Sequence, residues 1–79
     1  MYPTVDEVRQ AITTAFPGAD VSNIHAEGRR VLGSFVWTEF REIDDPERNR
    51  LVTRRVRAKM GPRGFNLGVL VPLAPGETL

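Results

Sequence analysis

Apolar residues recur every three or four positions near the start of the chain, which predicts an amphipathic helix over Thr4–Phe16. The apolar face of this helix consists of Val8, Ala11, Ile12 and Ala15. Thr4 and Glu7 have the spacing of a capping box, in which each side chain accepts a hydrogen bond from an otherwise unpaired backbone N–H. Pro17 and Gly18 follow directly, so we expect the helix to end there.

Three later segments have the pattern of β-strands. Val21–Glu27 is short and alternates its side chains, and a turn around Gly28 follows it. Val31–Ile43 is longer and has apolar residues on both faces, which is typical of a central strand. Phe65–Leu73 contains a continuous apolar run and ends at prolines, so it predicts a final buried strand.

The segment Asp44–Met60 is open to two interpretations. As a strand, its second half alternates charged and apolar residues, and the residues before it would form a hairpin loop. As a helix, Val52, Val56 and Met60 form a narrow apolar stripe at a spacing of four residues. The ends favour the helix, because Asp44 or Asp45 followed by Pro46 is typical of a helix start, and the basic last turns lead into Gly61 and Pro62.

These segments predict an α+β fold with the order α-β-β-α-β. We expect a three-stranded sheet with both helices packed on one face. The 79 residues are enough for a single domain, residues 1–79, in which Ala74–Leu79 would form a loose tail. With 41% apolar and 27% charged residues, the composition is that of a globular chain.

Composition excludes several function classes. The chain has no cysteine, which excludes disulfides, thiol catalysis and thiolate metal sites. It shows no secretory leader and no apolar run of the length that a membrane-spanning helix needs, about 18 residues. We therefore expect a cytoplasmic protein that does not enter membranes.

Few residues suggest catalysis. His25 is the only histidine, and its side chain is the only one that ordinarily titrates near neutral pH, but a surface position without a role fits it as well. Asp44, Asp45 and Glu47 resemble a carboxylate cluster, although their place at a helix start already accounts for them. Ser22 and Ser34 have no recognisable base nearby. We expect no enzyme activity and no cofactor.

Basic residues supply the most suggestive pattern. The net charge is only +1, yet six of the 11 basic residues fall between Arg48 and Lys59. On a helix, Arg50, Arg54 and Arg57 would share one face, and Arg48, Arg55 and Lys59 another. Guanidinium groups bind phosphate and carboxylate in a bidentate manner, so this helix predicts contacts to nucleic acid or to an acidic protein. The candidate binding residues are Arg50, Arg54, Arg55, Arg57, Lys59 and Arg63. The alternative is a solvated helix face whose side-chain stems shield the core.

A short glycine motif follows the basic segment. Gly61-Pro62-Arg63-Gly64 matches the GXXG loop with which KH domains clamp a nucleic-acid backbone. That loop normally joins two helices, whereas here it leads from a helix into a strand. The motif serves equally well as a helix stop.

Several short motifs together resemble the BolA family, small α+β domains related to the KH class. They are Ala15-Phe16-Pro17-Gly18-Ala19, the strand Val31–Phe40, Arg50-Leu51-Val52 in the second helix, and Leu73-Ala74-Pro75-Gly76-Glu77 at the end. The resemblance implies a non-enzymatic protein that pairs with a monothiol glutaredoxin, takes part in iron–sulfur cluster handling, or binds DNA.

The sequence departs from that family at the positions which ligate the cluster. The histidine that opens the family's last strand is replaced by Asn66, whose amide is a poor iron ligand, while His25 falls near the place of the second, variable ligand. The family's Phe-x-Gly-x-Ser segment is replaced by Phe40–Asp45. The resemblance therefore implies the adaptor role more strongly than the cluster role.

We accordingly predict a non-enzymatic adaptor domain of BolA-like type, monomeric or homodimeric, that acts through protein or nucleic-acid contacts on its Arg-rich helix. Three alternatives stay open. They are a KH-like nucleic-acid-binding module, a small enzyme or metal protein centred on His25, and a domain whose main role is oligomerisation through its sheet.

Overall fold

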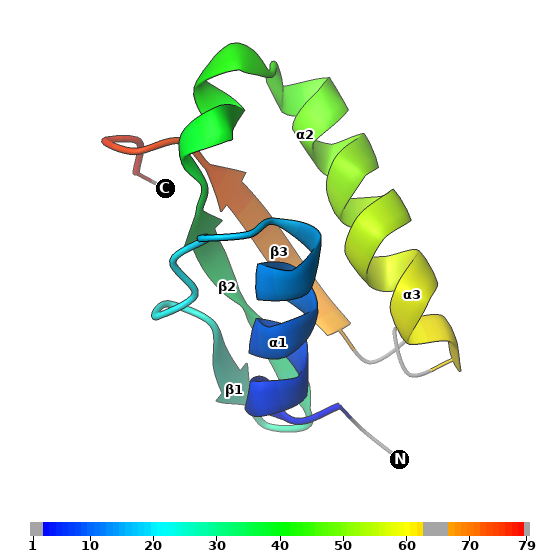
Figure 1. The fold of residues 1–79 in the computed structure, drawn as a ribbon. Coiled ribbons are helices and arrows are strands. Elements are labelled where there is room, and N and C mark those ends of the chain that lie inside the picture. The colour runs from blue at the N-terminus through cyan, green and yellow to red at the C-terminus, as the bar shows by residue number, and fades with distance from the viewer. Residues whose placement is uncertain (1–2, 63–66, 79) are drawn as a thin grey trace.

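A computed structural model describes residues 3–62 and 67–78 of the chain. It has the predicted α-β-β-α-β order, and both helical segments lie on one face of a three-stranded sheet (Figure 1). The fold is therefore a small α+β domain, as the sequence predicted. Its elements are α1 (Val5–Ala15), β1 (His25–Glu27), β2 (Arg30–Val36), the 3-10 helix η1 (Thr38–Glu42), α2 (Asp45–Val52), the π turn η2 (Thr53–Arg57), α3 (Ala58–Met60) and β3 (Leu67–Leu73).

The start of α1 has the predicted capping box. The Thr4 hydroxyl accepts a hydrogen bond from the Glu7 backbone N–H at 3.1 Å, and the Glu7 carboxylate accepts one from the Thr4 N–H at 3.4 Å. Val8 and Ile12 are fully buried, so this helix packs its apolar face on the sheet. The last turn of α1 contains no basic residue.

The sheet has the order β1-β2-β3 and is mixed. β1 pairs antiparallel with β2, and β2 pairs parallel with β3, so β3 forms an edge of the sheet beside α2 (Figure 1). The parallel pairing requires the long crossover that η1 and the second helical segment supply. Residues 65–66, where we placed the start of the last strand, lie outside the described residues.

The first strand is shorter than predicted. Only His25–Glu27 is extended, whereas the preceding residues turn because the Asp20 carboxylate accepts the Ser22 N–H at 2.9 Å. Asp20 itself makes an isolated bridge to Val36. The turn brings the chain back over β2 so closely that a Cβ built on Gly33 would lie 2.2 Å from the Asn23 carbonyl oxygen.

The second strand also ends earlier than predicted. Extended pairing stops at Val36, and Thr38–Glu42 forms a 3-10 helix instead of continuing the strand to Ile43. This turn directs Phe40 into the core, where its ring lies 5.3 Å from that of Phe16 and 5.2 Å from that of Trp37. Burying Phe40 among aromatic rings stabilises the turn more than further strand pairing in solvent would.

The segment after Asp44 is helical, which decides between the two interpretations in favour of the helix. Asp44 is the N-cap and accepts the Glu47 N–H at 3.1 Å, while Gly61 adopts a positive φ of 60° directly after the last turn. α2, η2 and α3 are consecutive, and we refer to them together as the second helix, residues 45–60.

The π turn begins after Val52 and contains Val56, the first two residues of the predicted stripe, which are buried, whereas Met60 is half-buried. In a regular α-helix, residues four apart differ in direction by about 40°, so such a stripe drifts around the axis. A π turn contains more residues than an α-helical turn. Here the Ala58 N–H donates to the Thr53 carbonyl, five residues earlier, instead of to the carbonyl four residues earlier. Val52 and Val56 therefore both face the sheet, with exposed fractions of 3% and 0%.

The segment that we expected to be a loose tail is attached to the domain as far as Glu77. Ala74 is buried, and its backbone N–H donates a hydrogen bond to the Glu77 carboxylate at 2.9 Å. The same carboxylate pairs with Arg48 on α2, a contact which the sequence pattern could not reveal.

Candidate binding surface on the second helix

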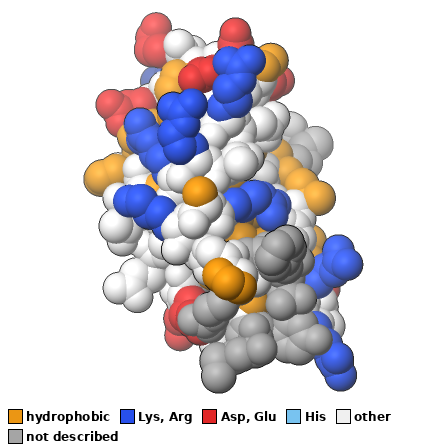
Figure 2. All heavy atoms as spheres, turned by 90° about the vertical axis from the view of Figure 1, so that its right-hand side faces the viewer, with side chains coloured by type: hydrophobic (Ala, Val, Ile, Leu, Met, Phe, Trp, Pro, Cys, Tyr) orange, Lys and Arg blue, Asp and Glu red, His pale blue; other side chains and the backbone are white. Residues whose placement is uncertain are grey.

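Charged side chains are unevenly distributed along the second helix. Figure 2 views the molecule from the side of this helix and shows Lys and Arg side chains spread over it, with Asp and Glu gathered at the upper end. That upper end is the helix start, where Asp44, Asp45 and Glu47 lie. Acidic groups there complement the positive end of the helix dipole.

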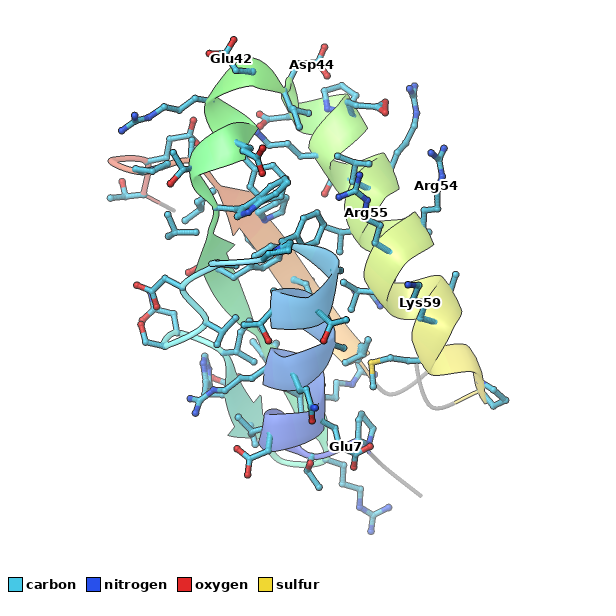
Figure 3. The ribbon with its side chains drawn as sticks, in the orientation of Figure 1. Glu7, Glu42, Asp44, Arg54, Arg55 and Lys59 are labelled. Carbon is cyan, nitrogen blue, oxygen red and sulfur yellow. The ribbon has the colours of Figure 1, made fainter. Side chains whose placement is uncertain are left out.

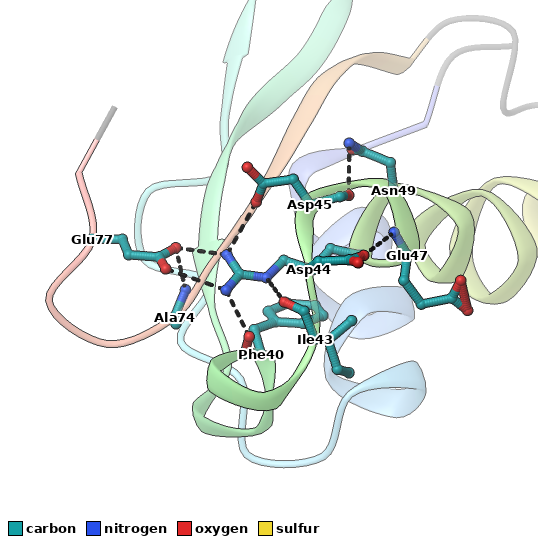
Figure 4. Close-up of polar contacts among 9 residues, drawn as sticks. Phe40, Ile43, Asp44, Asp45, Glu47, Asn49, Ala74 and Glu77 are labelled. Carbon is teal, nitrogen blue, oxygen red and sulfur yellow. Dashed lines mark hydrogen bonds and ion pairs between the residues drawn. The ribbon is translucent and has the colours of Figure 1, made fainter.

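Arg48 is a structural residue and not part of the exposed surface. Its side chain is 7% exposed and donates to the carbonyl oxygens of Ile43 at 2.7 Å and Phe40 at 2.6 Å (Figure 4). It also binds the Glu77 carboxylate at 2.6 Å and lies over the Phe40 ring. The predicted grouping of Arg48 with Arg55 and Lys59 on one binding face is therefore wrong, because Arg48 is buried and its guanidinium already binds two backbone carbonyls and the carboxylates of Glu77 and Asp45.

The pairing of Arg48 with Glu77 shifts both protonation equilibria toward the charged forms. Hydrogen bonding to Arg48, together with the Ala74 N–H, lowers the pKa of the Glu77 carboxyl below its ordinary value. The hydrogen bond to Glu77 raises the pKa of the Arg48 guanidinium. Both groups are thus ionised at neutral pH.

Arg50 and Arg54 lie together on the outer side of the second helix, as predicted. Both are exposed, and they border a shallow hollow with Pro46, Asn49 and Thr53. Arg50 is paired with Glu47 of its own helix at 2.9 Å, an exposed contact between residues three apart.

Arg55 lies on the other side of the second helix, toward α1 (Figure 3). Its guanidinium donates to the Ala15 carbonyl at 3.4 Å and lies 5.5 Å from the centre of the Phe16 ring. Because α1 has no basic residue in its own last turn, Arg55 supplies the cation that the negative end of its dipole favours. Arg55 is nevertheless only half-buried.

Arg55 and Lys59 border a groove between α1 and the second helix. This groove has a volume of about 480 Å³ and is open to solvent. Figure 3 shows Arg55 and Lys59 on the side of the second helix nearer α1, Arg54 on the far side, and Glu7 near the start of α1. The remaining lining residues are Gln10, Ala11, Thr14, Ala15 and Met60.

Arg57 does not join Arg50 and Arg54 on the outer side, which corrects the predicted face. It donates to the Gly68 carbonyl of β3 at 2.7 Å and is half-buried. The π turn changes the direction of the residues within it, so a regular helical period misplaces Arg57. Arg63, the last candidate, and the second half of the Gly61–Gly64 motif lie outside the described residues.

His25 lies on the opposite side of the domain from this helix, in β1 at the far edge of the sheet. Its Nδ1 is 2.9 Å from the Asn23 carbonyl oxygen and its Nε2 is 3.3 Å from the Glu27 carboxylate. Both partners accept hydrogen bonds, so the protonated ring satisfies both, and the pKa of His25 is raised, chiefly by the Asn23 carbonyl.

Metal binding and membrane insertion have no support in the described residues. Residues 3–62 and 67–78 contain no group of three or more His, Asp or Glu side chains that could hold a metal ion. In the same part of the chain, no helix has the length and apolar character needed to cross a membrane.

Comparison with known proteins adds no family to this description. The chain matches no protein-family model, no curated protein and no solved structure.

Sequence reasoning missed the α1 side of the groove. Gln10 and Thr14 are exposed polar residues flanking the apolar face of α1, and Ala11 and Ala15 belong to that face itself. Their spacing in the sequence is the same as that of residues at the solvent-exposed edge of any amphipathic helix. Only the packing of α1 against the second helix brings them opposite Arg55 and Lys59.

Proposed function

We propose that this chain is a non-enzymatic adaptor domain of BolA-like type, which acts by binding an acidic segment of a protein partner through the second helix. The observation that carries the proposal is the exposure of Lys59 and the half-exposure of Arg55 along the groove beside α1, on a helix that is anchored by the buried residues Val52 and Val56. A rigid helix fixes the spacing of these cations, which favours an acidic partner whose carboxylates have a matching spacing.

The small α+β fold agrees with the proposal, since the BolA resemblance implies a domain of that class. The contacts of the basic residues favour protein over nucleic acid. A phosphate backbone demands a row of free cations, but Arg48 is directed inward and Arg57 binds a backbone carbonyl. The acidic cluster at the helix start would also repel a strand that followed the whole helix.

Chemical-shift mapping tests the proposal. The ¹⁵N-labelled full chain is titrated in parallel with an acidic peptide, poly-glutamate, and with a single-stranded RNA of mixed sequence at the same ionic strength. We expect the acidic peptide to shift amide signals of residues 53–60, and to do so less as salt is added.

Two results would overturn the proposal. Shifts in the second helix with RNA but not with poly-glutamate would favour the KH-like nucleic-acid-binding alternative. An absence of shifts in this helix with either probe would remove it from consideration as a charge-based binding surface. Light scattering on the same samples reports whether the chain is a monomer or a homodimer.

A further inference from the structure

The groove between α1 and the second helix has charged and apolar parts in a definite arrangement. Its apolar lining residues are Ala11, Ala15 and Met60, and the polar residues Gln10 and Thr14 line it beside them. Two cations, Arg55 and Lys59, border it from the second helix, one helical turn apart. Uncharged lining residues together with two cations along one side suit an amphipathic occupant that has acidic residues on one flank.

Resting on the proposed function, we infer that this groove is the docking site, and that its occupant is an amphipathic α-helix of the partner with carboxylates four residues apart. Those carboxylates would meet Arg55 and Lys59, while the apolar stripe of the same helix would lie on Ala11, Ala15 and Met60. Alanines permit close approach of the incoming helix, and the methionine side chain adapts its shape to the residue placed on it.

The backbone on both sides of the groove favours a helix over an extended segment. α1 and the second helix satisfy most of their N–H and C=O groups internally, and the Ala15 carbonyl accepts from Arg55. An extended peptide would find no strand edge in this groove, so its own backbone groups would lose water without gaining partners. A helix brings its backbone hydrogen bonds with it.

The openness of the groove favours a macromolecule over a small ligand. Sites for small ligands enclose most of the ligand surface, whereas this groove of about 480 Å³ is exposed along its length. An occupant that remains half in solvent obtains its affinity from a long contact, as a helix of several turns does. Glu7 adds a negative charge near the start of α1, so a basic residue at that end of the partner helix would be favourable.

The probe is a fluorescently labelled synthetic peptide of about 15 residues, the length at which an isolated helix becomes stable. It carries leucines at helical spacing and two glutamates four residues apart on one flank. Fluorescence anisotropy measures its affinity for the full-length chain. A second peptide of the same charge has two central prolines, which prevent helix formation.

Two charge reversals on the same helix provide a matched comparison. Lys59→Glu changes the groove, while Arg54→Glu makes a similar change at an exposed position on the far side. We expect Lys59→Glu to weaken binding about tenfold, Arg54→Glu to change it less than about twofold, and the proline peptide to bind about tenfold more weakly. A peptide in which lysine replaces only the glutamate that meets position 59 should recover affinity for Lys59→Glu, because the remaining glutamate still meets Arg55. Circular dichroism of both variants controls for folding.

The outcomes separate this inference from the proposed function. If Arg54→Glu weakens binding as much as Lys59→Glu, the groove is not the site, although the second helix still binds acidic partners. If the proline peptide binds as well as the helical one, the occupant is not a helix. If the helical peptide fails to bind while poly-glutamate still shifts residues 53–60, the inference fails and the proposed function stands.

Discussion

Arg48 and Glu77 join two parts of the chain that are 29 residues apart, with guanidinium–carboxylate distances of 2.6 and 3.2 Å. The same guanidinium donates to the Phe40 and Ile43 carbonyls, so one side chain connects η1, the start of α2 and the segment after β3. Arg48 thus supplies hydrogen bonds to segments that lie outside the regular hydrogen-bond pattern of the helices and the sheet.

Replacing Arg48 should destabilise the domain strongly. Arg48→Met keeps much of the side-chain volume but removes the guanidinium donor from the Ile43 carbonyl and from the Glu77 carboxylate, while the Phe40 carbonyl keeps only the Ile43 N–H, at a cost of about 3 kcal/mol. Urea unfolding followed by Trp37 fluorescence measures the free energy of unfolding. Arg41→Met in η1 is the control, since Arg41 is exposed and should change stability by less than about 0.5 kcal/mol. Equal stability of the two variants would mean that Arg48 is not the central contact.

The Arg48–Glu77 pair should also make stability dependent on acid. Because the folded pKa of Glu77 lies below its ordinary value of 4.5, its contribution is complete above that value and is lost as pH falls through the lower folded pKa. Glu77→Gln removes this contribution. The difference in thermal midpoint between wild type and Glu77→Gln should therefore be constant near neutral pH and shrink below pH 4.5. A difference that does not change with pH would rule out the charged pair as its cause.

Gly33 is required by a close approach between two backbone segments. It has a φ of 133°, and a Cβ there would lie 2.2 Å from the Asn23 carbonyl oxygen, so Gly33→Ala must move the turn before β1. We expect a loss of at least about 3 kcal/mol from the strained φ and the overlap together. Gly18→Ala is the matched control: its φ of 87° is also positive, but nothing lies within 4 Å, so the loss should be about 1 kcal/mol. Chemical denaturation of both variants checks that Gly33→Ala loses more stability than Gly18→Ala.

Local signals were sufficient to predict the helices, because their ends depend on residues close in sequence. Thr4 with Glu7 and Asp44 with Pro46 form caps that involve neighbours only, and Gly61 marks the end of the second helix. The same locality resolved the helix and strand interpretations of the Arg-rich segment. Intrinsic preference and packing agree in both helices, which is the condition under which sequence patterns succeed.

The strand ends were mispredicted because distant contacts override β preference there. The run from Val36 to Phe40 has residues typical of strands, but Phe40 packs on Phe16 and the chain turns to allow it. The two basic faces of the second helix were half predicted for a similar reason. Helical spacing groups Arg55 with Lys59 correctly, yet it cannot reveal that Arg57 reaches a carbonyl on β3.

His25 should titrate above its ordinary pKa of 6.5, since the Asn23 carbonyl and the Glu27 carboxylate both accept hydrogen bonds from the protonated ring. A raised folded pKa means that this contribution to stability is complete below pH 6.5 and is lost as pH rises through the folded value. An NMR titration of the imidazole signals gives the pKa directly. Glu27→Gln should lower it, although not fully to the ordinary value, because the Asn23 carbonyl remains. No difference between wild type and Glu27→Gln would exclude the pairing.

Arg57 should contribute to stability and not to binding, unlike Arg55 and Lys59 on the second helix. Arg57→Met leaves the Gly68 carbonyl without its donor at the exposed edge of β3, which should cost about 1 kcal/mol, while Arg54→Met should cost less than half of that. In the anisotropy assay with the acidic helical peptide, Arg57→Met should bind as wild type does, because Arg57 is not among the residues lining the groove. The opposite result, wild-type stability with weakened binding, would mean that Arg57 releases Gly68 to meet the partner. The regular helical period would then have placed Arg57 on the binding surface correctly.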